Sequence, residues 1–397
     1  MVLGSKLCAW ALPVAQANTA APQARRLQRA RPPNRPRFFV RSIDTKLTLP
    51  CLMSPIRPGC SLPSSFVANL RASVRNLHKN WRSRQMIVNS AARRCAIVGS
   101  GSTWYRRPTM TILRHIRICN RHNPAHFVPI IVAGRSAGLT TWPVAEFLSR
   151  SMADFELGRR GLQLSVETVS GRSAAIAGAF AALQQAGLGV PARGELFPVV
   201  EDWGQPVLAT VDRAACALFG FRSFGLHVHG LVQESERTSM WIGRRGLDRG
   251  LAPGALDNMI AGGQPAGLSL MENLVKEAAE EASLPEAIAR TARPVGAVAY
   301  RQDQPGGPDG FPSGVKRDTL FVYELSLPAN IRPEPADSEV SGFALWPAER
   351  ALARTAETDD FKFNVPLTLI EFGLRHGLIT PDDPDYLNLL AGVFRPG

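Results

Sequence analysis

Residues 262–284 read GGQPAGLSLMENLVKEAAEEASL, a glycine-rich turn followed by a sequence typical of a helix. We expect that helix to run from about Ser269 to Ala282. On such a helix Glu277, Glu280 and Glu281 stand three and four residues apart and share one face. The stretch therefore predicts a helix that gathers three carboxylates beside a flexible turn.

Three neighbouring carboxylates repel each other unless a cation stands between them. Mg²⁺ prefers oxygen ligands and often shares its coordination shell with substrate phosphates, and Mn²⁺ is the expected substitute. A glycine lets backbone groups approach such an ion closely. We therefore expect a magnesium site with the ligands Gly262, Glu277, Glu280 and Glu281. The alternative is a solvated acidic patch on a surface helix, which the glycine pair and the polar loop before the helix disfavour.

The same residues resemble the Nudix box, written G-x5-E-x7-R-E-U-x-E-E-x-G-U, in which U is an aliphatic residue. The matching positions are Gly262, Glu277, Glu280, Glu281 and Leu284. The departures are Leu268 for the first Glu, Lys276 for the Arg and Ser283 for the last Gly. The resemblance implies a metal-dependent pyrophosphohydrolase with an α/β/α sandwich built on a mixed sheet.

Glu272 precedes Lys276 by four residues, the favourable order for an ion pair along a helix. We expect this pair to support the helix in place of the missing Glu and Arg of the box. In the mechanism that the resemblance implies, the metal neutralises phosphoryl oxygens and activates a water molecule. Either one glutamate of the cluster or Glu339, from a later strand region, accepts the proton of that water.

A narrower resemblance covers about residues 125–395. It is to a Nudix subfamily related to fungal thiamine pyrophosphokinase, whose members carry an extra N-terminal domain. Its most specific part is PGALDN at 253–258, which runs into AGGQP at 261–265. The resemblance implies hydrolysis of thiamine diphosphate, or of an oxidised or damaged analogue, to the monophosphate and phosphate. It also implies substrate-binding roles for Asp257, Asn258 and Gln264.

Two arginines and two histidines near the box are further candidates. Arg244 and Arg245 end a predicted strand close to the glycine turn, and a guanidinium matches a phosphate in charge and shape. We expect both to bind substrate, with ordinary surface ion pairs as the alternative. His227 and His229 point to one face of the preceding strand. Without a third ligand they are a weak metal site, so a buried polar pair is the better interpretation.

Hydrophobic periodicity along the chain predicts an α+β fold. We expect strands at 127–132, 163–168, 225–232, 240–243, 294–300, 319–327 and 340–346, and helices at 142–149, 173–186, 212–219, 269–282 and 365–376. This order predicts a small α/β domain at 122–221, followed by an α+β domain at 222–397, which the resemblance implies is a Nudix domain.

The formal net charge of +13 is concentrated at one end of the chain. Residues 1–121 hold 22 of the 46 Lys and Arg residues and one acidic residue, Asp44, whereas the remainder holds 24 basic and 32 acidic residues. This composition predicts a disordered basic arm over residues 1–121. Three interpretations of the arm stay open. It binds nucleic acid, although it has no motif of a known nucleic-acid-binding module. Alternatively it is an organelle transit peptide, or the gene model is over-extended and the protein really starts near Met110.

Cysteine usage and hydropathy indicate in which cellular compartment the protein lies and which classes of partner it binds. Five of the six cysteines lie in the arm, no CxxC pair occurs, and Cys216 alone lies in the body, which predicts a reducing, cytoplasmic location. No apolar run approaches the eighteen residues of a membrane span, so we expect no membrane partner. The resemblance implies a small-molecule diphosphate as the partner, and we expect no nucleic acid.

Three other functions compete with the hydrolysis of thiamine diphosphate. An isomerase of isoprenoid diphosphates needs a cysteine as acid-base partner, and Cys216, outside the box, is a poor candidate. A non-hydrolytic ligand-binding or regulatory Nudix module and a hydrolase of nucleoside diphosphate derivatives remain as alternatives. The sequence leaves the oligomeric state open.

Overall fold

A computed structural model of the chain describes residues 111–235, 237–307 and 310–394. Its centre is a mixed seven-stranded sheet with the strand order β11-β12-β7-β8-β13, in which β10 also pairs with β7 and β9 with β8. The strands are β7 (Arg222–Glu234), β8 (Arg237–Arg245), β9 (Leu256–Asp257), β10 (Ile260–Gly263), β11 (Arg293–Gln304), β12 (Gly314–Ser326) and β13 (Val340–Pro347). Only β12 and β7 run parallel; the other pairs in this sheet are antiparallel.

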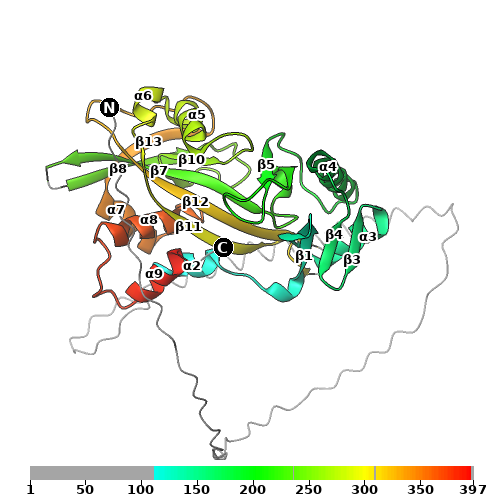
Figure 1. Cartoon of the computed structure of the whole chain (residues 1–397). Coiled ribbons are helices and arrows are strands. Elements are labelled where there is room, and N and C mark those ends of the chain that lie inside the picture. The colour runs from blue at the N-terminus through cyan, green and yellow to red at the C-terminus, as the bar shows by residue number, and fades with distance from the viewer. Residues whose placement is uncertain (1–110, 236, 308–309, 395–397) are drawn as a thin grey trace, which may run out of the picture. The chain divides into compact units, whose positions relative to one another are not determined.

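Helices cover both faces of this sheet (Figure 1). On one face, α5 (Leu270–Ala282) and α6 (Glu286–Ala289) pack on Leu226 and Val228 of β7. On the other face, α7 (Ala348–Glu357) and α8 (Val365–Arg375) pack against β8, β11 and β12. The result is the expected α+β fold, a mixed sheet between two helical layers.

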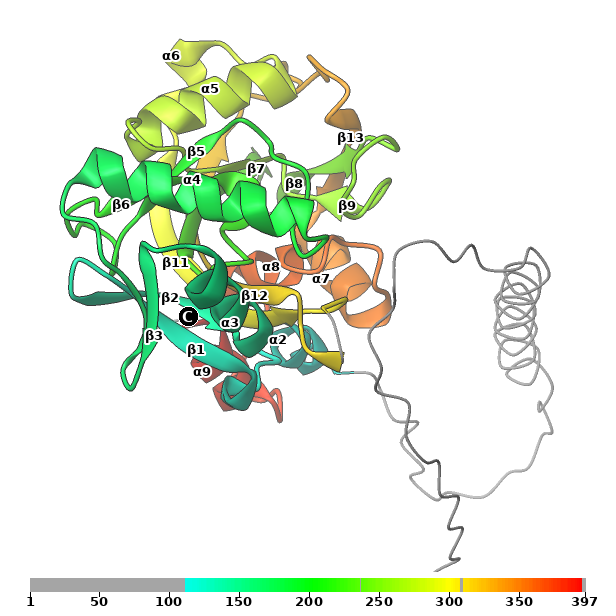
Figure 2. The ribbon, with the colours of Figure 1, turned by 90° about the vertical axis from the view of Figure 1, so that its right-hand side faces the viewer.

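Residues that precede this sandwich form a second, smaller α/β arrangement. A four-stranded sheet has the order β2-β1-β4-β3. Its strands are β1 (Phe127–Val132), β2 (Arg135–Thr141), β3 (Phe155–Gly158) and β4 (Gly161–Leu164). The helices α3 (Trp142–Ser151) and α4 (Val169–Gln185) and the hairpin of β5 (Leu196–Val199) and β6 (Ala209–Asp212) complete it, and α4 lies across β6 (Figure 2). The division between the two expected domains at residue 221 stays a prediction.

One expected helix, 212–219, is wrong. The structure has only the short 3-10 turn η2 (Arg213–Ala215) there. The carboxylate of Asp212 accepts hydrogen bonds from the backbone N–H groups of Arg193, Gly194 and Ala214, and so ties the start of this segment to the preceding loop. The carbonyl of Phe219 accepts a bond from Leu139 of β2, which draws the end of the segment toward the sheet.

The last part of the expected basic arm is folded, which corrects its boundary. Residues Leu113–Cys119 form α2, which packs on α8 and α9 (Tyr386–Val393) through Ile112, Leu113, Ile116 and Cys119. The guanidinium of Arg114 donates hydrogen bonds to carbonyls at the end of α7, those of Thr355, Ala356 and Thr358. A cation at that end also complements the helix dipole. Residues 1–110, the rest of the expected arm, lie outside the described residues.

The turn η1 (Pro124–His126) links α2 to β1. Among the described residues, no helix is both long and apolar enough to cross a membrane.

Candidate active site

The helix α5 begins where the sequence predicts, at a capping box. The hydroxyl of Ser269 accepts a hydrogen bond from the backbone N–H of Glu272, and the carboxylate of Glu272 accepts one from the backbone N–H of Ser269. These bonds satisfy N–H groups that the first turn of a helix leaves unpaired. The expected ion pair between Glu272 and Lys276 is therefore wrong, because capping already occupies the carboxylate.

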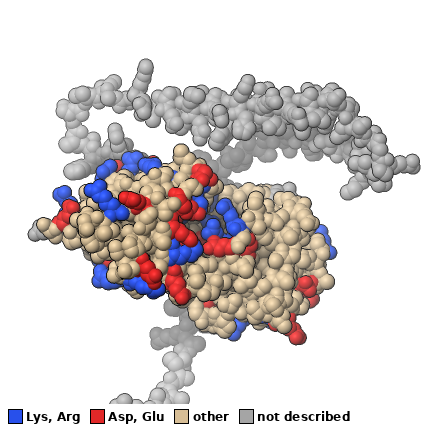
Figure 3. Space-filling model, turned by 90° about the horizontal axis from the view of Figure 1, so that it is seen from above, with Lys and Arg blue, Asp and Glu red and all other residues tan. Residues whose placement is uncertain are grey.

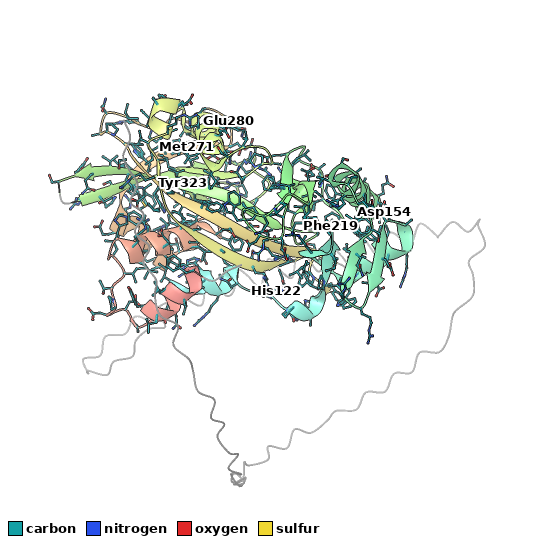
Figure 4. The ribbon with its side chains drawn as sticks, viewed as in Figure 1. His122, Asp154, Phe219, Met271, Glu280 and Tyr323 are labelled. Atoms are coloured by element: carbon teal, nitrogen blue, oxygen red, sulfur yellow. The ribbon has the colours of Figure 1, made fainter. Side chains whose placement is uncertain are left out.

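Lys276 binds forward along the helix instead. Its ammonium lies 2.6 Å from Oε2 of Glu280 and 3.3 Å from Oε1 of Glu277. Glu280 is half-exposed on the outer side of α5, above the sheet that carries Tyr323 (Figure 4). The lysine thus supplies positive charge between two of the three carboxylates.

Glu277 lies directly over Gly262 of β10. A Cβ atom added to Gly262 would stand 2.7 Å from Oε1 of Glu277 and closer still to its carbon atoms. Burial raises the pKa of the Glu277 carboxyl, although Lys276 counteracts this. The glycine is therefore required at this position for steric reasons, because any side chain there would displace Glu277.

Glu281 is the most deeply buried of the three glutamates. It is 7% exposed, and its Oε2 accepts a 2.8 Å hydrogen bond from the backbone N–H of Ala261. Burial raises its pKa well above the ordinary value, and the negative charges of Glu277 and Asp257 add to this effect. The structure thus places two poorly compensated carboxylates, Glu277 and Glu281, against the backbone of β10.

The glutamates suit a divalent cation in their chemistry. Within the described part of the chain, no three His, Cys, Asp or Glu side chains stand close enough together to form a metal site as they are. Glu277 and Glu280 nevertheless share a cation, Lys276, and burial raises the pKa values of Glu277 and Glu281. Oxygen ligands of this kind fit Mg²⁺ or Mn²⁺.

A small pocket adjoins Glu281 and brings several predicted residues together. Its lining comprises Gly243, Arg244, Arg245, Asp257, Asn258, Ala261, Glu281 and Val340. Asp257 lies between two cations, 3.1 Å from Nη1 of Arg245 and 3.3 Å from Nζ of Lys362. Although burial opposes its ionisation, these cations hold the pKa of Asp257 below its ordinary value. Buried positive and negative charge therefore meet beside the glutamates.

Asn258 and Gln264 are buried and hold backbone and side chains in place. The Oδ1 of Asn258 lies 2.7 Å from Nδ1 of His227, and its Nδ2 lies 3.0 Å from Nδ1 of His229. Burial lowers the pKa of His227 to about 4 and that of His229 to about 3, so both rings are neutral at pH 7. Gln264 donates a 2.6 Å bond to the carbonyl of Leu268 and closes the glycine-rich turn. The histidines form a buried polar pair, as the sequence indicates.

Two predicted residues have partners outside the glutamate cluster. Arg244 is exposed at the pocket, where its Nη1 donates to the carbonyl of Gly254. The carboxylate of Glu339 lies 2.6 Å from Nη1 of Arg249. A substrate-binding role for Arg244 and a base role for Glu339 stay predictions.

The sequence reasoning missed the partners that set the charge of this site. The sequence predicts that Lys276 binds Glu272, and it offers no signal for a role of Lys362. Lys362 is separated from Asp257 by 105 residues, so no local pattern could have joined them. The isolated β-bridge between Leu256 and Phe361 brings the two segments together.

Comparison with known proteins places the chain in a family. Nudix hydrolase 20, chloroplastic, of Arabidopsis thaliana is 33% identical over 308 residues, which cover 74% of this chain and 80% of that protein. Nudix hydrolase 24, chloroplastic, of the same plant is 33% identical over 283 residues, 70% of this chain and 76% of that protein. The chain belongs to the Nudix hydrolases. It is a hydrolase that acts on pyrophosphate bonds.

The segment before the sandwich matches a different family model. Residues 111–223 match the domain of unknown function DUF4743. Among solved structures, DR0079 from Deinococcus radiodurans is 22% identical and aligns over 45% of this chain and 96% of that chain, with a TM-score of 0.33.

Proposed function

We propose that the protein is a Mg²⁺-dependent pyrophosphohydrolase of a small diphosphate, namely thiamine diphosphate or a damaged analogue, which it cleaves to the monophosphate and phosphate. The observation that carries the proposal is the pair of buried glutamates, Glu277 and Glu281, whose pKa values burial raises. They lie on the helix α5, where Glu277 stands over Gly262, the glycine of the Nudix box, and Glu281 accepts a bond from the neighbouring Ala261.

Glu277, Glu280 and Glu281 would hold the metal, with the backbone of Gly262 alongside. When bound, Mg²⁺ supplies positive charge to the phosphoryl oxygens and lowers the pKa of a water molecule. The glutamates give this region a strong affinity for positive charge, because burial leaves their carboxylates poorly solvated.

The residues of the chain supply binding and proton transfer. A raised pKa makes Glu277 or Glu281 a stronger base than an exposed glutamate, which suits the acceptance of a proton from water. Glu339 is the alternative base, once its carboxylate leaves Arg249. Arg244, exposed at the pocket, suits a phosphate oxygen, and Asp257 keeps the neighbouring guanidinium of Arg245 oriented.

The identity of the diphosphate is supported by sequence alone. The stretch from Pro253 to Pro265, which contains Asp257, Asn258 and Gln264, resembles the thiamine-related subfamily, and it borders the pocket beside Glu281. Asn258 and Gln264 are buried, so they would assist substrate binding indirectly, by holding the glycine-rich turn in place.

The location in the cell is a proposal of the same kind. The two plant relatives carry the word chloroplastic in their names, which supports the organelle alternative over the cytoplasmic expectation. Fractionation of cells that express the full chain with a C-terminal tag would distinguish the two: recovery in the cytosol alone would contradict the organelle alternative.

The central experiment measures phosphate release by the full chain with Mg²⁺ from thiamine diphosphate, oxythiamine diphosphate, ADP-ribose and nucleoside diphosphates. We expect thiamine-type diphosphates to be the best substrates. Glu281→Gln should lower kcat by about 10²–10⁴-fold, because it removes a charge needed for metal binding or proton transfer. Urea unfolding should show that the variant still folds.

Glu286→Gln is the matched control. Glu286 lies on the neighbouring helix α6, where its exposed carboxylate binds Arg290, and its loss should leave phosphate release unchanged. Full activity of Glu281→Gln would sink the assignment of the metal site. A preference for ADP-ribose or nucleoside diphosphates would overturn the thiamine substrate while leaving the hydrolase intact.

A further inference from the structure

Three arginines stand side by side across three neighbouring strands. In the registers of the central sheet, Arg301 of β11 is opposite Arg317 of β12, and Arg317 is opposite Arg222 of β7. Directly opposed residues project from the same face of a sheet, and like charges in that position destabilise it. Negative charge near such a row would therefore stabilise it.

A pocket lies at this row, at a distance along β7 from the glutamates. It has a volume of about 460 Å³ and is lined by Ser136, Glu201, Asp202, Gln205, Arg222 and Arg317. None of these residues lines the pocket beside Glu281. Figure 3, which views the molecule from above, shows acidic and basic side chains gathered in a band beside a broad uncharged surface.

Arg317 is the deepest residue of the row. Only 8% of it is exposed, and its Nη1 donates hydrogen bonds to the carbonyls of Gly220, at 3.1 Å, and Ala137, at 3.4 Å. Its Nε is buried and has no partner among the described residues, and the same holds for Nε of Arg301. A buried N–H group without an acceptor costs free energy, so the two arginines, Arg317 and Arg301, lack hydrogen-bond acceptors for their Nε–H groups.

Among the described residues, two carboxylates lie beside the row. Glu201 pairs with Arg135 at 3.2 Å, and Asp202 stands 4.0 Å from Arg222. Within this described part of the chain, neither carboxylate forms an ion pair with Arg301 or Arg317. Burial lowers the pKa of Arg317 to about 10, and the charges of Arg222 and Arg301 contribute, yet the side chain stays protonated at pH 7.

We propose that this pocket binds a small oxyanion of the phosphate class, either free phosphate or the phosphate of a monoester. Buried guanidinium groups favour such a ligand, because it offers several acceptor oxygens and a compensating charge at once. Trp203 follows Asp202 and packs on Phe224 and Phe321, with ring centroids 4.8 and 4.7 Å apart, which fixes the acidic loop over the row.

The test is calorimetric titration of the full chain with inorganic phosphate, and in a second arm with methyl phosphate, in EDTA so that no metal binds at the glutamates. We expect saturable binding of one anion per chain. Arg317→Lys should weaken it about tenfold, because the lysine keeps the charge but loses donors. Arg301→Gln, at a less buried position, should weaken it severalfold if Arg317→Lys fails to fold.

Asp202→Asn acts in the opposite direction and should tighten binding, because it removes a competing negative charge from the pocket. Arg160→Gln, which removes an exposed arginine of the turn between β3 and β4, is the control and should leave the affinity unchanged. Tighter binding of methyl phosphate than of phosphate would identify a monoester as the ligand, and the reverse would identify free phosphate.

No saturable binding, or affinities that ignore both Arg301→Gln and Asp202→Asn, would overturn the proposal. So would loss of binding in Glu281→Gln, because the anion would then belong to the glutamate site. The proposal does not depend on hydrolysis, so an inactive enzyme that still binds phosphate through Arg317 leaves it standing.

Discussion

At the scale of single residues, the site depends on one missing side chain. Gly262 has no Cβ, and the carboxylate of Glu277 occupies the space where a Cβ would project. The Nudix box records this glycine as a sequence letter, whereas the structure gives the reason for it. The contact also explains how Glu277 can be buried directly against a strand.

Gly262→Ala should therefore displace Glu277. We expect diphosphate hydrolysis to fall about tenfold or more and the free energy of unfolding to fall by about 1–3 kcal/mol, because the added methyl overpacks the site. Steady-state kinetics and urea unfolding measure the two effects. Gly342→Ala, in β13, is the control, since a Cβ at Gly342 meets no atom within 4 Å.

A second variant distinguishes a steric clash with Glu277 from a general loss of stability caused by alanine in β10. In the Glu277→Ala background, Gly262→Ala should cost much less stability, because the side chain that it strikes is gone. Equal losses of stability in both backgrounds would contradict the steric account.

At the scale of elements, α5 shows what local sequence can and cannot predict. Its start was predictable, because Ser269 and Glu272 form the capping box from within four residues. Its carboxylate face was predictable from spacing. The choice of Lys276 between Glu272 and Glu280 was not, because it depends on which carboxylate the cap has already taken.

The C-terminal end of α5 contains a residue in a strained conformation. Ser283 adopts a φ of 52°, the left-handed region, at the position where the Nudix box has glycine. Ser283→Gly should raise the free energy of unfolding by about 0.5–1 kcal/mol, because glycine adopts this conformation without the steric cost of a Cβ. Ser283→Ala should give no such gain, and urea unfolding of the three proteins measures the difference. A stabilised alanine variant would contradict the explanation.

Contacts between elements that lie far apart in the chain could not be predicted from the sequence, for another reason. In α2, the apolar residues Ile112, Leu113 and Ile116 alternate with arginines in a way that composition alone assigns to a disordered arm. The partners that make this segment a helix lie more than 200 residues later. The row of Arg301, Arg317 and Arg222 likewise cannot be predicted until the register of β11, β12 and β7 is known.

At the scale of the whole molecule, two buried histidines make stability depend on pH. His227 and His229 have folded pKa values of about 4 and 3 because of burial, whereas in the unfolded chain they titrate near 6.5. Between these values the unfolded chain binds more protons than the folded one, so stability is lost as the pH falls below about 6.5. Asp257 and Glu324, whose folded pKa values are lowered, add to this loss only at more acidic pH, whereas Glu277 and Glu281, whose folded pKa values are raised, oppose it.

We therefore expect the free energy of unfolding to fall by a few kcal/mol between pH 7.5 and pH 5, on the scale of about 1.4 kcal/mol per pH unit for each histidine. Urea unfolding at several pH values measures the slope. His229→Asn should flatten it by about half, because one of the two titrating groups is removed. An unchanged slope in that variant would show that other groups cause the pH dependence.

The contact of α2 with α8 and α9 has a consequence for how the protein is made. On the ribosome α2 is the first of the described helices to be synthesised, and α8 and α9, on which it packs, are the last. Until α9 emerges, Leu113 and Ile116 lack the part of their apolar cluster that Leu389 and Val393 supply. The packing of α2 on α9 can therefore form only after α9 has been synthesised, and a nascent chain stalled before Tyr386 should leave that side of α2 accessible to proteases and chaperones.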